Sequence, residues 1–223
     1  MKAYVQHPLS FMLAFPDIHT HHAAPLSGFS IVSSSPEHFI PQEGRYYSVG
    51  LHPWALSAEY PSEADWEQLS HLVCLPQVLA VGEAGLDKLA TAPLSLQETV
   101  FERQARLADE TGKPLVIHLV KAVDELLRLR RSLSPRVPWV IHGFRGKAQL
   151  AQTLLRHGFY LSLGEHFHEA TLMAIPLSRL FLETDESSLP IMDLYARAAR
   201  ILRMSPEDLS EAVYANVQSV FLP

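Results

Sequence analysis

The sequence predicts an α/β protein, a TIM-like (β/α) barrel whose first two outer helices are lost or shortened. Three observations support this prediction. Eight short apolar segments recur along the chain, amphipathic patterns separate most of them, and polar residues follow several of their ends. Segments that are apolar throughout are typical of parallel strands, which are buried on both faces. Eight such strands favour a barrel, and we expect residues 1–223 to form one domain.

The eight expected strands are short runs rich in β-branched or aromatic residues. In chain order they cover residues 13–19, 29–34, 46–51, 78–83, 114–118, 138–142, 158–164 and 179–184. Only residues 20–28 separate the first two strands, and only residues 35–45 separate the next two. Because a packed crossover helix with its loops needs a longer connection, the first two outer helices are expected to be lost or reduced.

The expected helices carry recognisable end signals. Ser95 and Glu98 have capping-box spacing, and the last helix has Ser205 as its cap and Pro206 as its first residue. Gly158 is expected to end the helix before it. These signals, with the apolar periodicity, predict helices over residues 62–74, 95–113, 123–133, 147–158 and 205–221.

Composition and charge are those of an ordinary globular protein. Hydrophobic residues make up 48% of the chain and charged residues 19%, and the net charge of −6 gives no global attraction to nucleic acid. No apolar run approaches the ~20 residues of a membrane span. Residues 1–15 lack a signal cleavage site and are read as mature protein. The single cysteine, Cys74, excludes an internal disulfide, and we expect a cytoplasmic monomer or weak oligomer with no membrane partner.

Histidines and acids stand at the carboxyl ends of the expected strands. They are His19, His21, His52, Glu83, His118, His142 and Asp185. In a parallel barrel these ends share one rim, where active sites lie. Residues two apart on a strand point to the same side, so His19 and His21 can address one point. This many imidazole and carboxylate groups exceeds the needs of one tetrahedral ion and favours two divalent ions that share a carboxylate.

Six motifs, in order, resemble those of the TatD-related DNase family of metal-dependent hydrolases. They are "DIHTHH", "VGLHPW", "VGEAGLD", "FERQARLADETGKPLVIH", "VIHGFRG" and "LFLETD". The tail "MSPEDLSEAVYANVQSVF" is similar to the closing helices of that family. The resemblance runs from about residue 15 to residue 221. Each motif alone is weak, but six in the right order are highly specific.

The resemblance implies a two-metal site in a TIM-like barrel. The implied ligands are His19, His21 and Asp185 for one ion and His118 and His142 for the other, with Glu83 bridging both. The ions are compatible with Zn, Mn, Mg or Ni. Asp185 and Glu83 are the expected catalytic groups, and His52 is expected to contact a phosphate oxygen or the leaving group.

The expected activity is that of a deoxyribonuclease, a hydrolase of ester bonds that cleaves phosphodiesters with a metal-activated water. Asp185 accepts or relays the proton of that water, and the ions stabilise the charge of the transition state. The expected partner is DNA or a small phosphodiester. Two alternatives remain open: a metal-dependent amide or ester hydrolase, since the same chemistry attacks a carbonyl, and a non-catalytic metal-binding protein.

The pocket walls are expected to differ from the family's pattern, because residues 186–188 after "ETD" replace an apolar and proline-aromatic segment, the loop after them is short, and residues 22–46 are trimmed. The loops after the fifth and sixth strands depart from the pattern as well. Many members read H-S-R-D-A after the fifth strand, whereas this chain has Val120 and Lys121 in place of the arginine and the aspartate. Arg145 stands where a small polar residue is common. Lys121, Arg145 and Lys147 together are expected to restore a basic rim over the metals, and Lys121 and Arg145 are the expected substrate-binding residues. Metal binding therefore carries over from the family, and the DNA substrate does not follow automatically.

Several further residues have expected supporting roles. Asp17 is expected to orient a ligand histidine or the strand end, and Glu183 to lie beside the metals. His22 is expected in a loop, and Asn216 in a capping or structural role. Trp54 either lines the pocket or packs in the core; the sequence leaves both open.

Overall fold

The protein contains eight parallel strands in a sheet whose spatial order follows the chain. The computed structural model describes residues 15–22 and 28–222. The strands are β1 (Asp17–Thr20), β2 (Ser30–Ser34), β3 (Tyr46–Val49), β4 (Val78–Asp87), β5 (Leu115–Val120), β6 (Trp139–Ile141), β7 (Tyr160–Leu163) and β8 (Leu180–Leu182). Each strand pairs in parallel with the next. The predicted fold class is confirmed.

The backbone of Asp185 closes the barrel between β8 and β1. Its amide donates a hydrogen bond to the carbonyl of His19 at 2.9 Å, and its carbonyl accepts one from the amide of His21 at 3.1 Å. Asp185 has a left-handed φ of 56°, which aspartate tolerates better than most residues. Barrel closure therefore brings the last acidic residue of the expected site beside its first two histidines.

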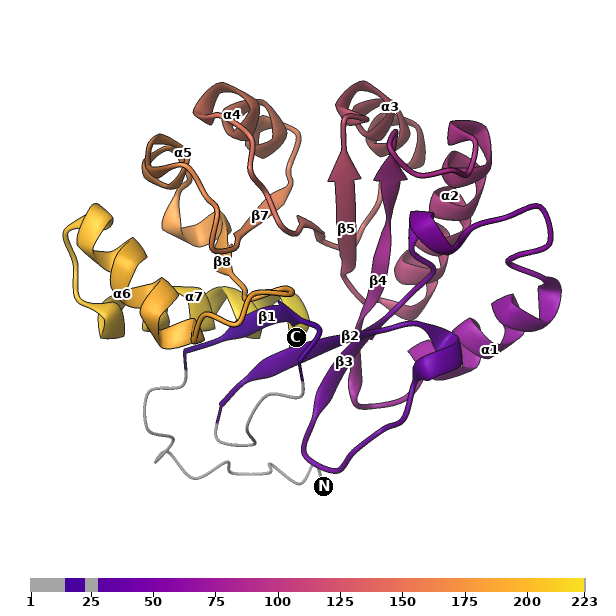
Figure 1. Ribbon diagram of the computed structural model, residues 1–223, viewed down its shortest axis with the longest axis horizontal. Helices are drawn as coiled ribbons and strands as arrows, with labels where there is room; N and C mark the ends of the chain where they lie inside the picture. The colour runs from indigo at the N-terminus through magenta and orange to yellow at the C-terminus, as the bar shows by residue number, and fades with distance from the viewer. Residues whose placement is uncertain (1–14, 23–27, 223) are drawn as a thin grey trace.

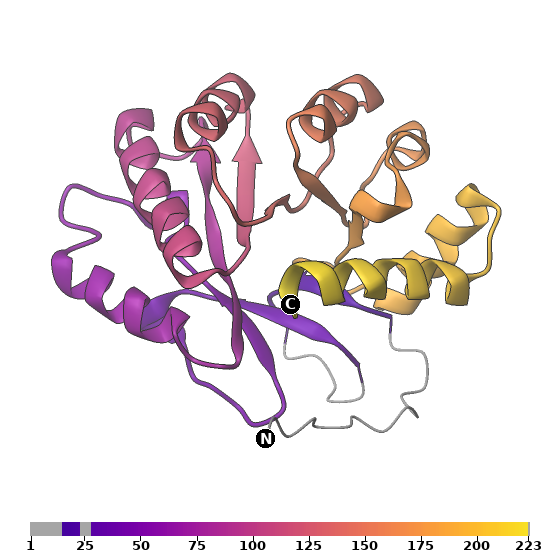
Figure 2. The same ribbon diagram turned by 180° about the vertical axis from the view of Figure 1, so that it is seen from behind.

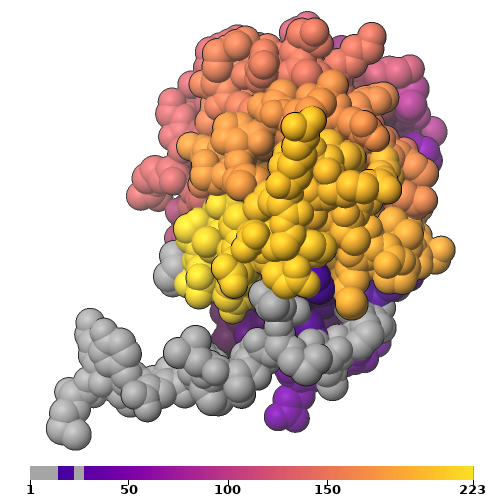
Figure 3. Space-filling view, turned by 90° about the vertical axis from the view of Figure 1, so that its left-hand side faces the viewer, coloured from indigo at the N-terminus to yellow at the C-terminus, as the bar shows by residue number. Residues whose placement is uncertain are grey.

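Helices cover the outside of the barrel from β3 onwards. They are α1 (Glu63–Val73), α2 (Leu94–Thr111), α3 (Val123–Leu133), α4 (Ala148–Arg156), α5 (Glu169–Ala174), α6 (Ile191–Leu202) and α7 (Pro206–Phe221). Figures 1 and 2 show α1 to α5 following one another around the outside, with α6 and α7 beside β8 and β1. In Figure 3 these two yellow helices form one side of the molecule. Within residues 15–22 and 28–222, no helix has the length and apolar character needed to cross a membrane.

The early connections are shorter than the later ones. Between β2 and β3 the crossover is reduced to one 3-10 turn, η1 (Pro36–His38), in agreement with the prediction of a shortened helix. The connection between β1 and β2 falls partly outside the described residues, as do residues 13–14 of the first predicted strand. The described residues therefore do not test the predicted loss or shortening of the first outer helix, which stays a prediction.

The predicted cap of the helix after β4 is wrong, whereas that of the last helix is confirmed. Helix α2 begins at Leu94, and no side chain caps it. The carbonyl of Pro93 accepts hydrogen bonds from the amides of Leu96 and Gln97, so Ser95 already lies inside the first turn. In α7, by contrast, the hydroxyl of Ser205 accepts a hydrogen bond from the amide of Asp208 at 3.0 Å.

Strand β4 runs on to Asp87 instead of ending at Glu83, because its later residues continue to pair with β5. Two glycines permit this close approach. A Cβ on Gly85 would lie 2.1 Å from the carbonyl oxygen of His118, and Gly82 has a φ of 147° that side chains rarely adopt. The consequence is that the backbone on both sides of Glu83 lies close against β5.

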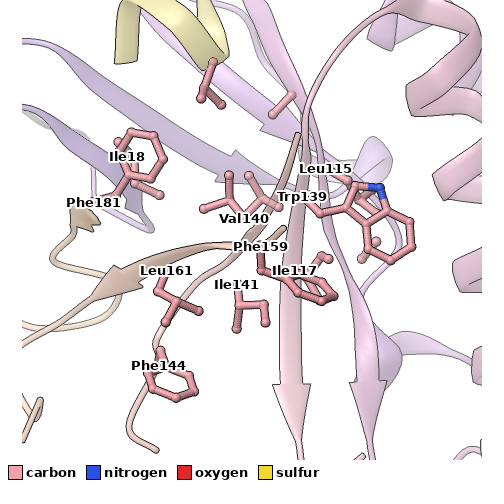
Figure 4. Close-up of a cluster of buried hydrophobic side chains, with 14 of the residues drawn as sticks. Ile18, Leu115, Ile117, Trp139, Val140, Ile141, Phe144, Phe159, Leu161 and Phe181 are labelled. Atoms are coloured by element: carbon pink, nitrogen blue, oxygen red, sulfur yellow. The ribbon is translucent and has the colours of Figure 1, made fainter. Parts of the chain in front are cut away.

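The barrel interior and the layer between barrel and helices form one apolar core. Figure 4 shows Ile117, Ile141 and Leu161 from neighbouring strands close together, and all three are almost completely buried. On the same, helix-facing side of the sheet as Ile141, the ring of Trp139 lies 5.3 Å from that of Phe101 of α2. Burying such side chains contributes about 1.5–3 kcal/mol each. This rigid core fixes the strand ends that carry the polar residues.

Asn216 anchors α7 to the segment that leads into β8. Its Nδ2 donates hydrogen bonds to the carbonyl of Leu177 at 2.6 Å and to that of Leu180 at 3.0 Å. Leu177 belongs to the 3-10 turn η3 (Leu177–Arg179). The side chain is buried, so these carbonyls would not easily exchange their partner for water. This is a structural role of the kind that the sequence predicted.

Asn216→Ala should therefore lower the free energy of unfolding by about 1–3 kcal/mol, because buried carbonyls lose their donor. Urea denaturation measures the change. Gln218→Ala is the matched control, since Gln218 lies on the exposed side of the same helix and should change stability by less than about 0.5 kcal/mol. Equal effects of the two substitutions would contradict the anchoring role.

Candidate metal centre

Glu83 lies among five imidazoles at the carboxyl ends of the strands, two of which face one of its oxygens and three, His52 included, the other. Its Oε2 is 3.3 Å from Nε2 of His19 and 3.2 Å from Nε2 of His21. Its Oε1 is 2.7 Å from Nε2 of His142 and 3.6 Å from Nδ1 of His118. The carboxylate is buried, and it separates the histidines into two groups.

Asp185 joins the group on the Oε2 side. Its Oδ1 lies 3.7 Å from Nε2 of His19 and 3.5 Å from Nε2 of His21. The structure thus brings together all six residues predicted as ligands, which we call the ligand cluster: His19, His21, Glu83, His118, His142 and Asp185. Within it, His19, His21 and Glu83 offer donor atoms within 4.8 Å of one another, as do His19, His142 and Asp185.

Two histidines of the ligand cluster have buried ring nitrogens with no hydrogen-bond partner among the described residues. They are His19 and His142; the carboxylates of Glu83 and Glu183 lie within ion-pair distance of the His142 ring but form no hydrogen bond of normal geometry with it. A buried polar atom without a partner is costly, and such atoms are rare in native proteins. Imidazole nitrogens and carboxylate oxygens that converge on one point are suitable ligands for a divalent cation, which would satisfy them. The residues present therefore fit a metal ion.

Asp87 sets the orientation of His118. Nε2 of His118 lies 3.1 Å from Oδ2 of Asp87. Burial opposes ionisation of Asp87, but hydrogen bonds from Trp54, Leu89 and His118 outweigh it and lower the pKa of Asp87. A carboxylate only accepts hydrogen bonds, so Nε2 of His118 donates to Asp87, and Nδ1 is the ring nitrogen that faces Glu83. Sequence reasoning assigned Asp87 no role.

Glu183 stands in the same relation to His142. Its Oε1 lies 3.4 Å from Nδ1 of His142, while Nε2 of that ring faces Glu83. Glu183 is completely buried. Burial disfavours its charged form, yet the adjacent imidazole of His142 and its positive charge lower the pKa of Glu183 below its usual value. The prediction that Glu183 lies beside the ligand residues is thus met by a direct contact.

Charge coupling dominates the electrostatics of the ligand cluster. Burial opposes the charged forms of both Glu83 and His142. The charges of His142 and His19 nevertheless hold the pKa of Glu83 well below its usual range. In turn Glu83 and Glu183 raise the pKa of His142 well above that of a free imidazole. Positive charge near Glu83 is thus strongly favoured, which is the electrostatic requirement of a cation site.

His52 differs from the other histidines at this rim. Burial lowers the pKa of His52 to about 4, so its ring is neutral at pH 7. Its Nδ1 accepts a hydrogen bond from the amide of Trp54 at 3.2 Å, so Nε2 carries the proton. That Nε2 lies 3.6 Å from Oε1 of Glu83. A protonated nitrogen does not bind a metal ion, and His52 is suited to donate a hydrogen bond to an anionic substrate.

Two further residues support the ligand cluster from β1 and β2. The hydroxyl of Ser33 donates to Oε2 of Glu83 at 3.3 Å, a contact that no sequence motif indicated. Asp17 accepts hydrogen bonds from the amide of Thr184 at 3.0 Å and from its hydroxyl at 2.6 Å. Burial raises the pKa of Asp17 to about 6. Asp17 therefore ties the start of β1 to the segment that carries Asp185, as expected of a residue that orients the strand end.

A cavity of about 1420 Å³ opens over the ligand cluster. Lys121 and Arg145, the predicted substrate residues, both line it, and so does Trp54. Arg145 also lines a side cavity of about 220 Å³, together with His166. The exposed ring of His22 lies 3.2 Å from the carbonyl of Glu186, in a loop as predicted. The cavity thus combines cations, an aromatic ring and the ligand cluster.

Comparison with known proteins matches residues 39–222 to the family model "TatD related DNase". The chain is 30% identical over 200 residues to the uncharacterized metal-dependent hydrolase YjjV of Escherichia coli, covering 79% of this chain and 76% of that one. It is 34% identical over 168 residues to the 3'-5' ssDNA/RNA exonuclease TatD of Klebsiella pneumoniae, covering 70% of this chain and 62% of the relative. The crystal structure of YjjV superposes with a TM-score of 0.80 at 22% identity, covering 95% and 100% of the two chains, and supports the fold.

Glu183→Gln should weaken metal binding by roughly 10- to 100-fold, because the neutral amide removes the negative charge that favours a proton on Nδ1 of His142 and so leaves Nε2 to face the metal. Competition with a chromogenic chelator at fixed pH measures the affinity. Glu110→Gln, an exposed position on α2, is the matched control. Unchanged affinity in the Glu183 variant would show that this carboxylate does not orient His142.

Proposed function

The chain belongs to the TatD-related DNase family, and we propose that it is a divalent-metal-dependent hydrolase that cleaves phosphodiester bonds in nucleic acid. The match over residues 39–222 confirms the family that the sequence motifs indicated. The proposed activity rests on one observation, which is that the two carboxylate oxygens of Glu83 face different histidines. One oxygen faces His19 and His21, and the other faces His118 and His142.

We propose that the protein holds two ions, one on each side of Glu83. The first would bind to His19, His21 and Asp185, and the second to His118 and His142, with Glu83 as the shared ligand. Four imidazoles are more nitrogen donors than Mg²⁺ prefers, so Zn²⁺, Mn²⁺ or Ni²⁺ suits the site better. Bound there, divalent ions would make a water molecule acidic and offset negative charge on the phosphate.

The reaction requires a group that takes a proton from the attacking water, and Asp185 meets that requirement. Its side chain is 26% exposed, faces the cavity and ends within 4 Å of His19 and His21. The water oxygen forms a bond to phosphorus, and the bond from phosphorus to the leaving oxygen breaks. The proton passes to Asp185 and then to the leaving oxygen, which gives an alcohol and a phosphomonoester.

The side chains around the rim of the cavity would bind the substrate. Neutral His52 presents its Nε2–H as a donor to a phosphate oxygen. Lys121 and Arg145 contribute positive charge on the wall of the same cavity. A chain with a net charge of −6 needs such a local basic region to bind a polyanion.

Glu83→Ala should reduce metal-stimulated cleavage of a single-stranded DNA oligonucleotide below detection, because both ion sites lose their shared ligand. Asp185→Asn should lower kcat by about 10²–10⁴-fold through loss of the proton acceptor. Gel analysis of cleavage, with and without chelator, measures both effects. Glu110→Ala is the control and should cleave like the wild type.

The same assay should include a simple phosphodiester, a carboxylic ester and an amide. Hydrolysis of the carbonyl compounds alone would contradict phosphodiester specificity and favour an amide or ester hydrolase. Metal binding without turnover of any compound would favour a non-catalytic protein. Wild-type rates in the Glu83 variant, with an intact circular dichroism spectrum, would exclude the proposed site.

A further inference from the structure

Trp54 is an exposed aromatic residue beside the ligand cluster. It lies in the 3-10 turn η2 (Pro53–Ala55) that follows β3, and 63% of its surface is exposed. The other two tryptophans of the chain, Trp66 and Trp139, are 6% and 0% exposed. Trp54 lines the same cavity as Glu83. Of the two roles that the sequence left open, core packing is therefore excluded.

The indole of Trp54 is held in one orientation although its surface is open. Its Nε1–H donates a hydrogen bond to Oδ2 of Asp87 at 2.6 Å. Asp87 is buried, and its other oxygen accepts from the amide of Leu89 at 2.7 Å. The backbone of Trp54 is fixed as well, through the bond from its amide to Nδ1 of His52. A ring held in this way loses little conformational entropy when it binds a ligand.

One carboxylate separates this indole from the ligand cluster, since Oδ2 of Asp87 also lies 3.1 Å from Nε2 of His118. A substrate whose phosphate lies at the ligand cluster would thus place its neighbouring group near Trp54. An open indole face binds flat aromatic groups by stacking, and every nucleobase has such a face. In a duplex that face is covered by neighbouring bases, so only an unpaired base is available.

We propose that Trp54 stacks on an unpaired base next to the scissile phosphate and so selects for an unpaired nucleotide at that position. This inference rests on the proposed phosphodiesterase function and adds a specificity-determining residue to it. The indole nitrogen fixes the ring through Asp87, while the ring face binds the base.

Two 5′-labelled single strands of equal length and charge provide the test. One carries thymine at every position, and the other has abasic sugars on both sides of the cleaved bond. The ratio of their kcat/KM values with the metal-loaded protein measures the contribution of the base. Stacking predicts a ratio of roughly 5- to 150-fold for the wild type.

Trp54→Phe and Trp54→Leu separate stacking from positioning. Both remove the hydrogen bond to Asp87, so any effect through His118 acts on both strands and cancels in the ratio. Phenylalanine keeps an aromatic face and should keep most of the ratio, whereas leucine should reduce it to about one. Met192→Leu, at an exposed position on α6, is the surface control and should leave the ratio unchanged.

Tryptophan fluorescence of the full chain in chelator provides a readout without turnover. The thymine strand should quench the emission saturably and the abasic strand should not, because only Trp54 is exposed. A wild-type ratio near one, an unchanged ratio in Trp54→Leu, or equal quenching by both strands would overturn the inference. Failure to cleave either strand would instead refute the proposed function, and the quenching comparison would still decide whether Trp54 binds a base.

Discussion

The buried carboxylate of Glu83 is the constraint on which the rest of the site depends. A lone carboxylate in this position would be costly, and the imidazoles around it favour its charged form. Its placement follows from β4, where Gly82 and Gly85 allow a close approach to β5 that no larger residue would permit. Because its two oxygens face different histidines, one side chain organises both halves of the ligand cluster.

Fold and site are also coupled where β8 meets β1 and the barrel closes, a junction that we call the seam. The backbone of Asp185 closes the barrel against β1, while its side chain faces the cavity beside His19 and His21. Asp17 strengthens the seam through Thr184. A change that opened this seam would displace three members of the ligand cluster at once. The first and last segments of the chain thus contribute to one centre through the geometry of closure.

Much of the fold and of the ligand cluster was predictable because both repeat a simple rule: an apolar strand followed by a polar residue at its end. The residues that orient the ligand histidines were harder to predict from the sequence. Asp87 shares a strand face with Glu83, and that period of two was a usable signal, but its hydrogen bonds to Trp54 and His118 depend on how three segments meet. Ser33 carries no local signal at all, since its contact with Glu83 exists only in three dimensions. The predicted N-cap at Ser95 is wrong because Pro93, two residues earlier, already occupies the N-cap position of α2. A residue of the preferred capping type therefore does not always mark where a helix begins.

In the function we propose, Glu83 is the ligand that two divalent ions share, one on each side of its carboxylate. A crystal structure of the metal-loaded protein, with anomalous difference maps recorded at the metal's absorption edge, tests this most directly. We expect two anomalous peaks. Oε2 of Glu83 should bind the ion that His19 and His21 bind, and Oε1 should bind the ion that His118 and His142 bind. A single peak, or two peaks that Glu83 does not connect, would contradict it.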